Sequence, residues 1–334
     1  MKKEKILELL KQTNDYVSGQ SLAHQLGVSR NTVWKAIKAL EEDGYEIESQ
    51  TNRGYRLKEL TSQLSALELT RLAPWLKDRL ILQPTIGSTN TWLKENQDNL
   101  PDRTIVLTSD QTGGRGRQGR SFYSSGGSGI YLSVLYRGAN LPDPGFITLA
   151  AGLAVAELLE AAGFDPSIKW VNDVFLGQHK VCGILTEGEL ELESGQMKYL
   201  ILGIGLNVNH SSFPPELESI ATSLALQSGH RFNLNHLTVS LISILDRMMP
   251  QISLSLDPAI FRQNTDSLVE QFNRHLYAKG EEVTLSGGSQ TLITGRLIGI
   301  DSQGRLILET VSGQKAFPYG EYRLTGPAPD PQQN

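Results

Sequence analysis

The spacing of the hydrophobic residues changes twice along this chain, and that change most constrains its fold. Helical spacing dominates the first 40 residues, strand-like and helical runs mix in the middle, and short strand-like runs take over from Glu281. The length of 334 residues allows two or three domains. The sequence therefore predicts an α+β protein of several domains.

The first 60 residues predict a winged helix-turn-helix. Three short apolar stripes with helical spacing follow one another, and Ser29 precedes the third as a predicted N-cap. Two strand-like runs then flank residues 51–54, where Asn and Gly favour a hairpin turn. The stripes contain Ile6, Leu9 and Leu10, then Leu22, Ala23 and Leu26, then Val33, Ile37 and Leu40.

The charge of this segment favours DNA as a partner. Residues 1–58 carry ten basic and eight acidic side chains, although the whole chain has a net charge of -5. DNA binding needs donors for phosphates and base edges on one exposed helical face, with help from the wing. A protein-binding winged helix with a solvated basic face remains an alternative. The candidate DNA-binding residues are Arg30, Asn31, Thr32, Lys35 and Arg53.

Cysteine content and hydropathy exclude several classes of protein. The single cysteine, Cys182, allows no disulfide within the chain and no cysteine-cluster metal site, and the six histidines have no ligand spacing, so we expect no metal-ligating residues. The N-terminus has no signal-peptide pattern. The most apolar segment, 144–156, is shorter than the roughly 20 residues that span a bilayer. We expect a cytoplasmic protein without a membrane partner.

A glycine- and arginine-rich segment, 111–120, follows a predicted strand at 105–108. It contains a G-x-G-x-x-G string, but neither a helix nor a ribose-binding acid follows at the spacing that dinucleotide binding needs. No P-loop Gly-Lys-Ser/Thr occurs either. The remaining interpretation is a loop that folds around an anion and grips it with guanidinium groups. A nucleic-acid-binding loop is equally compatible with this segment alone.

Two further strand-rich segments complete the pattern. Residues 167–187 predict two strands around a turn at 177–179, and residues 199–209 predict an apolar strand with interior glycines at 203 and 205. Interior glycine weakens a strand and often marks a place where a ligand approaches the backbone. This part of the chain is therefore a candidate ligand site.

Five motifs in this order resemble the biotin protein ligases. They are Ser88-Thr89-Asn90, the Gly-Arg-Gly-Arg-Gln-Gly of 114–119, the Lys-Trp-Val-Asn-Asp of 169–173, Lys180 with the Gly-Ile-Leu of 183–185, and the Gly-Ile-Gly-Leu-Asn of 203–207. With the winged helix in front, the chain is similar to the bifunctional class that also represses biotin genes. The resemblance covers residues 4 to about 325. One departure is Val171, where the family usually has proline.

The resemblance implies an activity and its site. The chain would use ATP, biotin and Mg²⁺ to form biotinyl-5′-AMP and biotinylate a lysine of the biotin carboxyl carrier protein, a subunit of acetyl-CoA carboxylase. With the adenylate bound it would form a homodimer on operator DNA. The implied catalytic residues are Lys180, Arg117 and Asp173; the biotin-binding residues are Ser88, Thr89, Asn90, Gln111, Arg115, Gly116, Arg117, Lys180, Gly203 and Gly205; the ATP or adenylate residues are Arg115, Arg117, Lys169, Asn172 and Asn207.

The same residues also allow purely structural interpretations. Ser88-Thr89-Asn90 could serve only as a helix cap, Asp173 as a turn residue and Lys180 as a strand-edge charge. Three rival functions remain: a biotin sensor without catalysis, a lipoate or octanoate transferase, and a ligase whose winged helix binds no DNA. The loop arginines, Lys180 and Asp173 favour the ligase.

The predicted architecture is thus α+β and multidomain. A winged helix occupies residues 1–60, and a linker with a short helical stripe occupies 61–80. A mixed α/β ligase domain follows at 81–278, then a small SH3-like β-barrel at 279–325. A disordered, proline-containing tail is predicted at 326–334.

Overall fold

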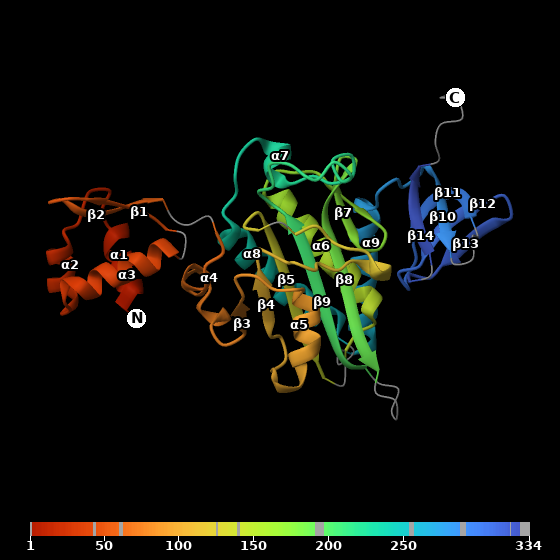
Figure 1. Ribbon diagram of the computed structural model, residues 1–334. Coiled ribbons are helices and arrows are strands. Elements are labelled where there is room, and N and C mark those ends of the chain that lie inside the picture. Colours follow the sequence, from red (N-terminus) through yellow and green to blue (C-terminus); the bar gives the residue numbers. More distant parts are fainter. Residues whose placement is uncertain are drawn as a thin grey trace. The chain divides into compact units, whose positions relative to one another are not determined.

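The computed structural model contains two compact units, which are described separately (Figure 1). The first comprises Met1–Asp78 with Phe232–Leu237, and the second Arg79–Arg231 with Thr238–Asn334. The structure describes residues 2–42, 45–59, 63–124, 126–138, 141–190, 197–253, 257–287, 292–320 and 322–327. The first residues of the predicted linker, 61 and 62, lie outside this set.

The first unit has the predicted winged helix-turn-helix. Helices α1 (Lys2–Lys11), α2 (Gly19–Leu26) and α3 (Arg30–Glu42) precede the antiparallel hairpin of β1 (Glu46–Gln50) and β2 (Gly54–Glu59). The predicted cap of α3 is confirmed, because Ser29 Oγ accepts a hydrogen bond of 3.1 Å from the backbone N–H of Thr32. Gly54 is required at the turn, where an added Cβ would lie 2.2 Å from the carbonyl oxygen of Val17.

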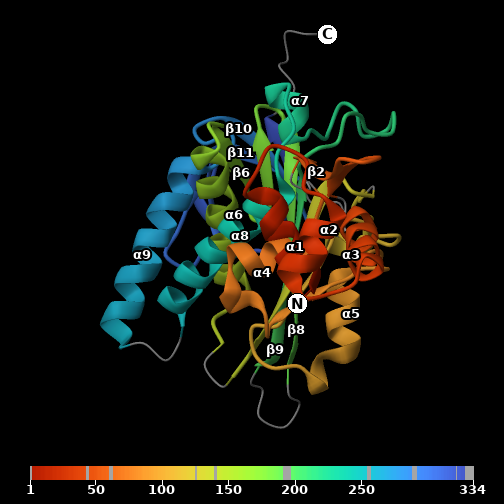
Figure 2. The same ribbon diagram turned by 90° about the vertical axis from the view of Figure 1, so that its left-hand side faces the viewer.

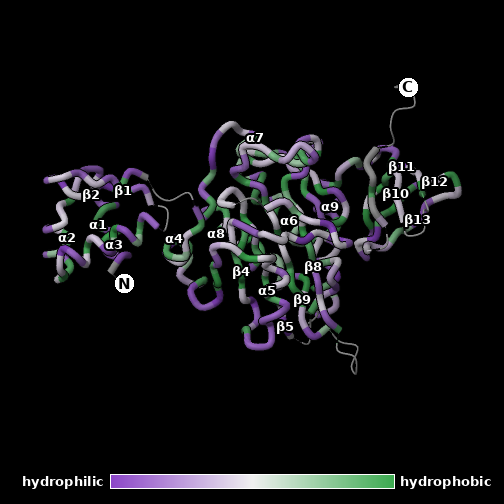
Figure 3. The backbone as a smooth tube through the Cα atoms, viewed as in Figure 1, coloured by the Kyte–Doolittle hydropathy of each residue, from purple (hydrophilic) through white to green (hydrophobic). Residues whose placement is uncertain are grey.

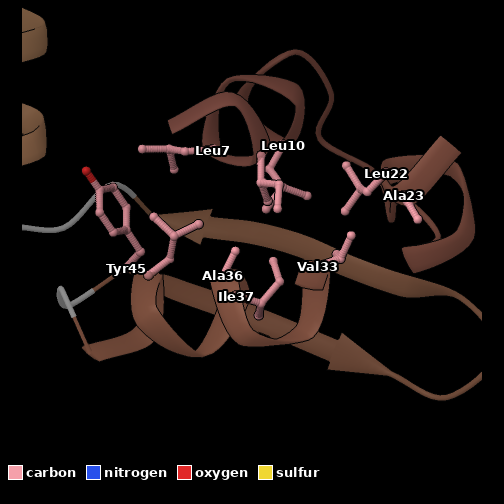
Figure 4. Close-up of a cluster of buried hydrophobic side chains, with 10 residues drawn as sticks. Leu7, Leu10, Leu22, Ala23, Val33, Ala36, Ile37 and Tyr45 are labelled. Atoms are coloured by element: carbon pink, nitrogen blue, oxygen red, sulfur yellow. The ribbon is translucent and has the colours of Figure 1, made fainter. Parts of the chain in front are cut away.

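One apolar cluster holds the three helices together (Figure 4). Each predicted stripe contributes to it, and Tyr45 closes one end. Burying these side chains is worth roughly 1.5–3 kcal/mol for each large aliphatic group. The cluster consists of Ile6, Leu7, Leu10, Leu22, Ala23, Val33, Ala36, Ile37, Leu40 and Tyr45.

The predicted linker contains the helix α4 (Ala66–Leu72), and its Glu68 forms a buried ionic centre in the first unit. The Glu68 side chain is 1% exposed and receives hydrogen bonds from Lys11 (3.2 Å), Arg71 (2.5 Å) and the Tyr45 hydroxyl (3.1 Å). Burial alone would raise the pKa of Glu68, but the hydrogen bonds from Arg71 and Lys11 outweigh it and lower that pKa. This centre ties α4 to α1 and the start of β1.

The second unit contains the predicted mixed sheet. Its strand order is β3-β4-β5-β9-β8-β7-β6, and only the β3–β4 pair is parallel. Figure 3 shows hydrophobic residues along these strands, as expected for a sheet covered by helices. The strands are β3 (Leu80–Leu82), β4 (Ile105–Thr108), β5 (Gly129–Arg137), β6 (Pro166–Lys169), β7 (Asp173–Leu176), β8 (His179–Leu190) and β9 (Met197–Asn207).

Helices cover both faces of this sheet. Figure 2 shows α5 (Thr89–Asn96) on one face and α6 (Pro144–Ala161), α8 (Leu234–Met248) and α9 (Pro258–His275) on the other. A short helix, α7 (Leu224–Ser228), follows β9.

The expected apolar segment of 13 residues is in fact the 18-residue helix α6. Its length and composition would suffice to cross a membrane, but 72% of it is buried inside this unit. The central helix of a folded domain shows this kind of burial.

A small antiparallel β-domain ends the second unit, as predicted. Its strand order is β13-β12-β11-β10-β14, and Trp170 Nε1 donates a hydrogen bond of 3.1 Å to its Gly304 carbonyl. The strands are β10 (Glu282–Gly287), β11 (Leu292–Ile300), β12 (Leu306–Thr310), β13 (Gly313–Phe317) and β14 (Tyr322–Pro327).

The sequence predicts strands of this β-domain at 283–285, 291–294, 295–300, 306–310 and 319–324, and the structure differs in three details. Runs expected as two strands at 291–294 and 295–300 form one strand, β11, within the described residues. The edge strand β13 was missed because four of its five residues are exposed and carry no apolar alternation. Strand β14 runs to Pro327, so the first two residues of the predicted tail belong to the sheet, and residues 328–334 lie outside the described set.

We predict that Glu68→Gln destabilises the first unit by about 1–3 kcal/mol at pH 7, because two cations lose a buried anionic partner. The pKa of Glu68 is lower in the folded state, so its contribution is present above the ordinary value of about 4.3 and is lost as the pH falls. Amide hydrogen exchange in α1 and α4 at pH 7 and pH 4 measures both effects.

The matched control is Glu42→Gln, since Glu42 is exposed at the end of α3. It should leave exchange unchanged. Equal exchange rates in Glu68→Gln and the wild type at pH 7 would contradict a stabilising role for the buried carboxylate.

Candidate functional site

Three glycines on one face of the sheet form the floor of a cavity. Gly205 pairs directly with Gly183 across β8–β9, and Gly203 pairs with Ser133 across β9–β5, so all point to the face that α5 covers. A Cβ at Gly203 would lie 2.2 Å from Asn90 Oδ1, and one at Gly205 would lie 2.6 Å from the Phe122 ring. The backbone at 203 and 205 is therefore closely approached by the protein's own side chains, and approach of a ligand there stays a prediction.

The cavity above this floor, about 460 Å³ including its open mouth, brings distant motifs together. All ten residues predicted to bind biotin line it: Ser88, Thr89, Asn90, Gln111, Arg115, Gly116, Arg117, Lys180, Gly203 and Gly205. We call it the first cavity.

Neutral polar groups form a hydrogen-bonded network at one end of the first cavity. The backbone N–H of Thr89 and its hydroxyl both donate to Gln111 Oε1, at 2.9 and 3.2 Å. Ser133 Oγ lies 2.7 Å from Thr89 Oγ1 and 2.6 Å from Asn90 Oδ1, and Asn90 Nδ2 donates to Glu187 Oε2 at 2.8 Å. The network offers donors and acceptors to a neutral polar ligand.

Ser88 also has the local role that the sequence left open. It is the N-cap of α5, accepting a hydrogen bond from the N–H of Thr91, and it lines the first cavity as well. The helix cap and the candidate site are therefore compatible.

Cationic groups surround the other end of the first cavity. Lys180 Nζ lies 2.7 Å from Asp173 Oδ1, and Arg117 Nη1 donates to Asn172 Oδ1 at 3.1 Å. Asn172 in turn donates to Asp173 at 3.0 Å, so one chain of contacts joins both cations. Burial lowers the pKa of Arg117, an effect that Asp173 partly offsets, yet an arginine stays charged at neutral pH. This end suits an anion.

A second cavity of about 740 Å³ adjoins the first, since Arg117, Asn172, Lys180, Gly116 and Phe122 line both. Lys169 lies in the second cavity, where its Nζ is 5.6 Å from the Phe175 ring centre and 5.7 Å from that of Tyr277. The β14 side chains Tyr322 and Leu324 complete the lining. The C-terminal β-domain thus contributes to this cavity.

The segment at the family's usual proline has a cis peptide bond between Trp170 and Val171. The charged residues on either side of Val171 have different partners. Asp173 forms its ion pair with Lys180, while Lys169 faces two aromatic rings.

One predicted site residue, Asn207, does not line either cavity among the described residues. It is buried, and its Nδ2 donates to the Thr222 carbonyl at 3.1 Å. Its Oδ1 has no hydrogen-bond partner in the described part of the chain. The structure therefore gives Asn207 a role in holding the segment after β9, and contact with a nucleotide remains a prediction.

Two residues at the site, Phe122 and Glu187, were not predicted from the sequence. Phe122 packs against Gly183 and Gly205, and Lys180 Nζ lies 5.5 Å from its ring centre. Glu187 accepts from Asn90 and also forms an ion pair of 3.4 Å with Arg115. An aromatic residue directly after the glycine-rich loop was the available signal for Phe122, but only the strand register could reveal Glu187.

The candidate DNA-binding residues lie on α3 and the wing of the first unit. Arg30, Asn31 and Lys35 are exposed on α3. Thr32 is half-buried, and its hydroxyl lies 2.9 Å from Ser29 Oγ. Arg53 folds back over the Tyr16 ring at 4.3 Å and donates to Asp15 and Gln50, so it contacts its own unit instead of extending from the wing.

Comparisons with known proteins agree along most of the chain. Residues 2–56 match the HTH domain family, residues 82–207 the biotin/lipoate A/B protein ligase family, and residues 280–321 the biotin protein ligase C terminal domain. The bifunctional ligase/repressor BirA of Bacillus spizizenii is 34% identical over 322 residues, which cover 93% of this chain and 94% of that protein. The biotin–[acetyl-CoA-carboxylase] ligase of Mycobacterium tuberculosis is 29% identical over 72% of this chain and 92% of its own length.

A solved structure supports the same similarity. The biotin protein ligase from Aquifex aeolicus in complex with biotin and ATP superimposes with a TM-score of 0.64 at 29% sequence identity. The match covers 74% of this chain and 99% of that one.

We predict that Gly203→Ala destabilises the second unit by roughly 1–3 kcal/mol, because the new methyl group overlaps the hydrogen-bonded Asn90 amide. The control is Gly152→Ala in α6, where the Cβ would meet Ile168 at an ordinary 3.5 Å and alanine favours the helix. Thermal unfolding compares the two variants. A loss of stability in Gly152→Ala as large as in Gly203→Ala would refute the clash at Asn90.

Proposed function

The chain belongs to the biotin protein ligase family as a bifunctional ligase/repressor, and from this we propose that the first cavity binds biotin and the second binds ATP. It is a biotin–protein ligase that uses ATP and has the DNA-binding domain of a repressor. The main support for this proposal is that residues from five separate motifs line one cavity, which has a neutral polar end and a cationic end.

The two ends of the first cavity match the two ends of biotin. A ureido group has N–H donors and a carbonyl acceptor, which suit the Thr89, Asn90 and Gln111 network. A carboxylate suits the end with Lys180 and Arg117. Biotin in this orientation would present its carboxylate where the first cavity meets the second.

The first half-reaction joins two anions, so it needs cations more than a nucleophile. A carboxylate oxygen of biotin attacks the α-phosphorus of ATP, the bond to pyrophosphate breaks, and biotinyl-5′-AMP forms. Lys180 and Arg117 would neutralise the charge that develops on the phosphorus oxygens. Both cations line both cavities, which favours this role. Lys169 would hold the phosphates from the second cavity.

Mg²⁺ would enter with ATP. No group of three or more His, Cys, Asp or Glu that could hold a metal ion occurs among the described residues. Mg²⁺ bound to ATP takes its ligands mainly from phosphates and water, with few protein carboxylates. When bound, it supplies charge neutralisation on the phosphates.

The second half-reaction transfers biotin to an acceptor amine. A lysine amine of the carboxyl carrier protein attacks the acyl carbon of the adenylate, AMP leaves, and the amine loses a proton. Asp173 would orient the amine or receive its proton, because it lies 2.7 Å from Lys180 at the place where the carboxyl reacts. We propose the cytoplasm, where this acceptor is made, as the site of the reaction.

Lipoate or octanoate transfer is the rival that shares the family match at residues 82–207. The polar network of Thr89, Asn90 and Gln111 favours biotin, because lipoate and octanoate have an apolar end without hydrogen-bonding groups. Pyrophosphate release by the purified protein with ATP and biotin, compared with ATP and lipoate, tests this choice. Release with lipoate at the biotin rate would overturn it.

We predict that Lys180→Ala slows single-turnover adenylation by roughly 30- to 1,000-fold, as expected for a charge that acts mainly in the transition state. Biotin affinity should change much less. Rapid-quench measurement of biotinyl-adenylate and calorimetric titration of biotin separate the two effects.

Lys198→Ala is the matched control. Lys198 lies on β9 and forms ion pairs with Asp98 and Glu189, and it lines neither cavity among the described residues. Its variant should adenylate biotin at the wild-type rate. An unchanged rate in Lys180→Ala would remove Lys180 from the mechanism.

We further propose that the adenylate controls DNA binding through dimerisation. One recognition helix makes few base contacts, so a two-fold symmetric operator requires two copies. The loop that carries Arg115 and Arg117 would be ordered by the adenylate and would favour the dimer. Unmodified carrier protein would consume the adenylate and relieve repression.

We predict that ATP with biotin raises both dimerisation and operator affinity by about 5- to 150-fold, the usual range of coupling between two sites. Sedimentation velocity and gel-shift titration measure the two effects. Lys180→Ala should show both effects only after a longer preincubation with ATP and biotin, but without delay when biotinyl-adenylate is added. Equal dimerisation and equal DNA affinity with and without the adenylate would refute the coupling.

A further inference from the structure

The exposed face of α3 carries a large aromatic side chain that the winged-helix core does not use. Trp34 is 50% exposed, although it lies between two residues of the helix that the core cluster buries, Val33 and Ala36. An exposed indole on a small domain loses the stabilisation that its burial would provide. Its position therefore needs another explanation.

The neighbours of Trp34 on the helix surface are basic or amide side chains. At about 100° per residue, Trp34 lies within roughly 60° of Arg30, Asn31 and Lys38. Arg30 and Asn31 are exposed, and the first turn of α3 contains no acid. Lys38 forms an ion pair with Glu41 one turn later, at 2.5 Å. Toward the start of α3, Trp34 thus borders basic and amide side chains without an acid, and this part of the surface is complementary to a polyanion with apolar groups in its interior.

DNA offers such a surface in its major groove. Phosphates border the groove, and thymine presents a C5-methyl group there, the one apolar group among the base edges. Arg30 and Lys35 can reach phosphates, and the Asn31 amide can pair with a base edge. The indole between them is the group suited to cover a methyl.

We propose that Trp34 packs on the C5-methyl group of a thymine in the major groove and is a specificity-determining residue for the operator. This role rests on the proposed DNA binding by α3. Two other uses of the indole are outcomes of the test: donation of its N–H to a phosphate, and contact with a second copy of this chain.

Deoxyuridine tests the contact directly, because it differs from thymidine only by lacking that methyl group. Full-length protein with ATP and biotin selects a preferred site from a random duplex pool, and fluorescence anisotropy gives its affinity. Replacing one thymine in each half-site by deoxyuridine should weaken wild-type binding by about 5-fold or more, the lower range of one lost base contact. Trp34→Ala should weaken binding to the thymine duplex similarly and be insensitive to the replacement.

Two variants keep the test independent of misfolding. Trp34→Phe keeps an aromatic ring and should retain most of the loss of affinity that the deoxyuridine replacement causes. Lys35→Ala should weaken binding to all duplexes and reduce the salt dependence while keeping the full penalty. Biotinylation of the carrier protein should be unchanged in all three variants.

Specific results overturn the proposal. If no thymine replacement weakens wild-type binding, or Trp34→Ala shows the same penalty as wild type, Trp34 does not contact a thymine methyl. Equal loss of specific and non-specific binding in Trp34→Ala would indicate a phosphate contact, and loss of dimerisation alone would indicate a contact between copies. If the wild type enriches no sequence at all, DNA recognition by α3 fails together with this role.

Discussion

The candidate site depends on three glycines of one sheet face, where no side chains fill the space. Gly183, Gly203 and Gly205 leave a gap between β8 and β9 and the helix above them, and any Cβ there would collide with Asn90, Phe122 or Lys180. Removing three side chains weakens a strand, so the fold accepts a local cost to keep this space. The surrounding strands compensate with a fully buried core on the opposite face, against α6.

Two carboxylates then fix the polar groups around this gap. Glu187 holds Arg115 of the glycine-rich loop, and Asp173 holds Lys180 and, through Asn172, Arg117. In a partly buried site these ion pairs are stronger than on the surface, and a bound anion competes for the same cations. A bound anion would therefore link the position of the loop to the occupancy of the site through charge. A regulatory response to the ligand needs such a link.

Much of this could be predicted from local sequence. The apolar stripes ending at Leu40 form the winged helix, because a helix with one apolar face must bury it. The loop motif, Lys180 and Gly203 were grouped from the sequence because these residue types together suit an anionic ligand and a close backbone approach, and they line one cavity. The missed edge strand β13 and the misjudged length of helix α6 lacked a local signal, because exposure and burial there depend on neighbours distant in sequence.

The sequence by itself determined the three-part architecture, the residue types of the candidate site and the basic residues of α3, since these follow from residue types at short spacings. Only the tertiary structure decided which groups meet. Strand register opposes Gly205 to Gly183, and it pairs Lys180 with Asp173 while Lys169 turns to two aromatic rings. The physical reason is that register and helix packing are set by the summed burial of a whole sheet. The local sequence around each of two residues that are far apart in the chain does not indicate that they are in contact.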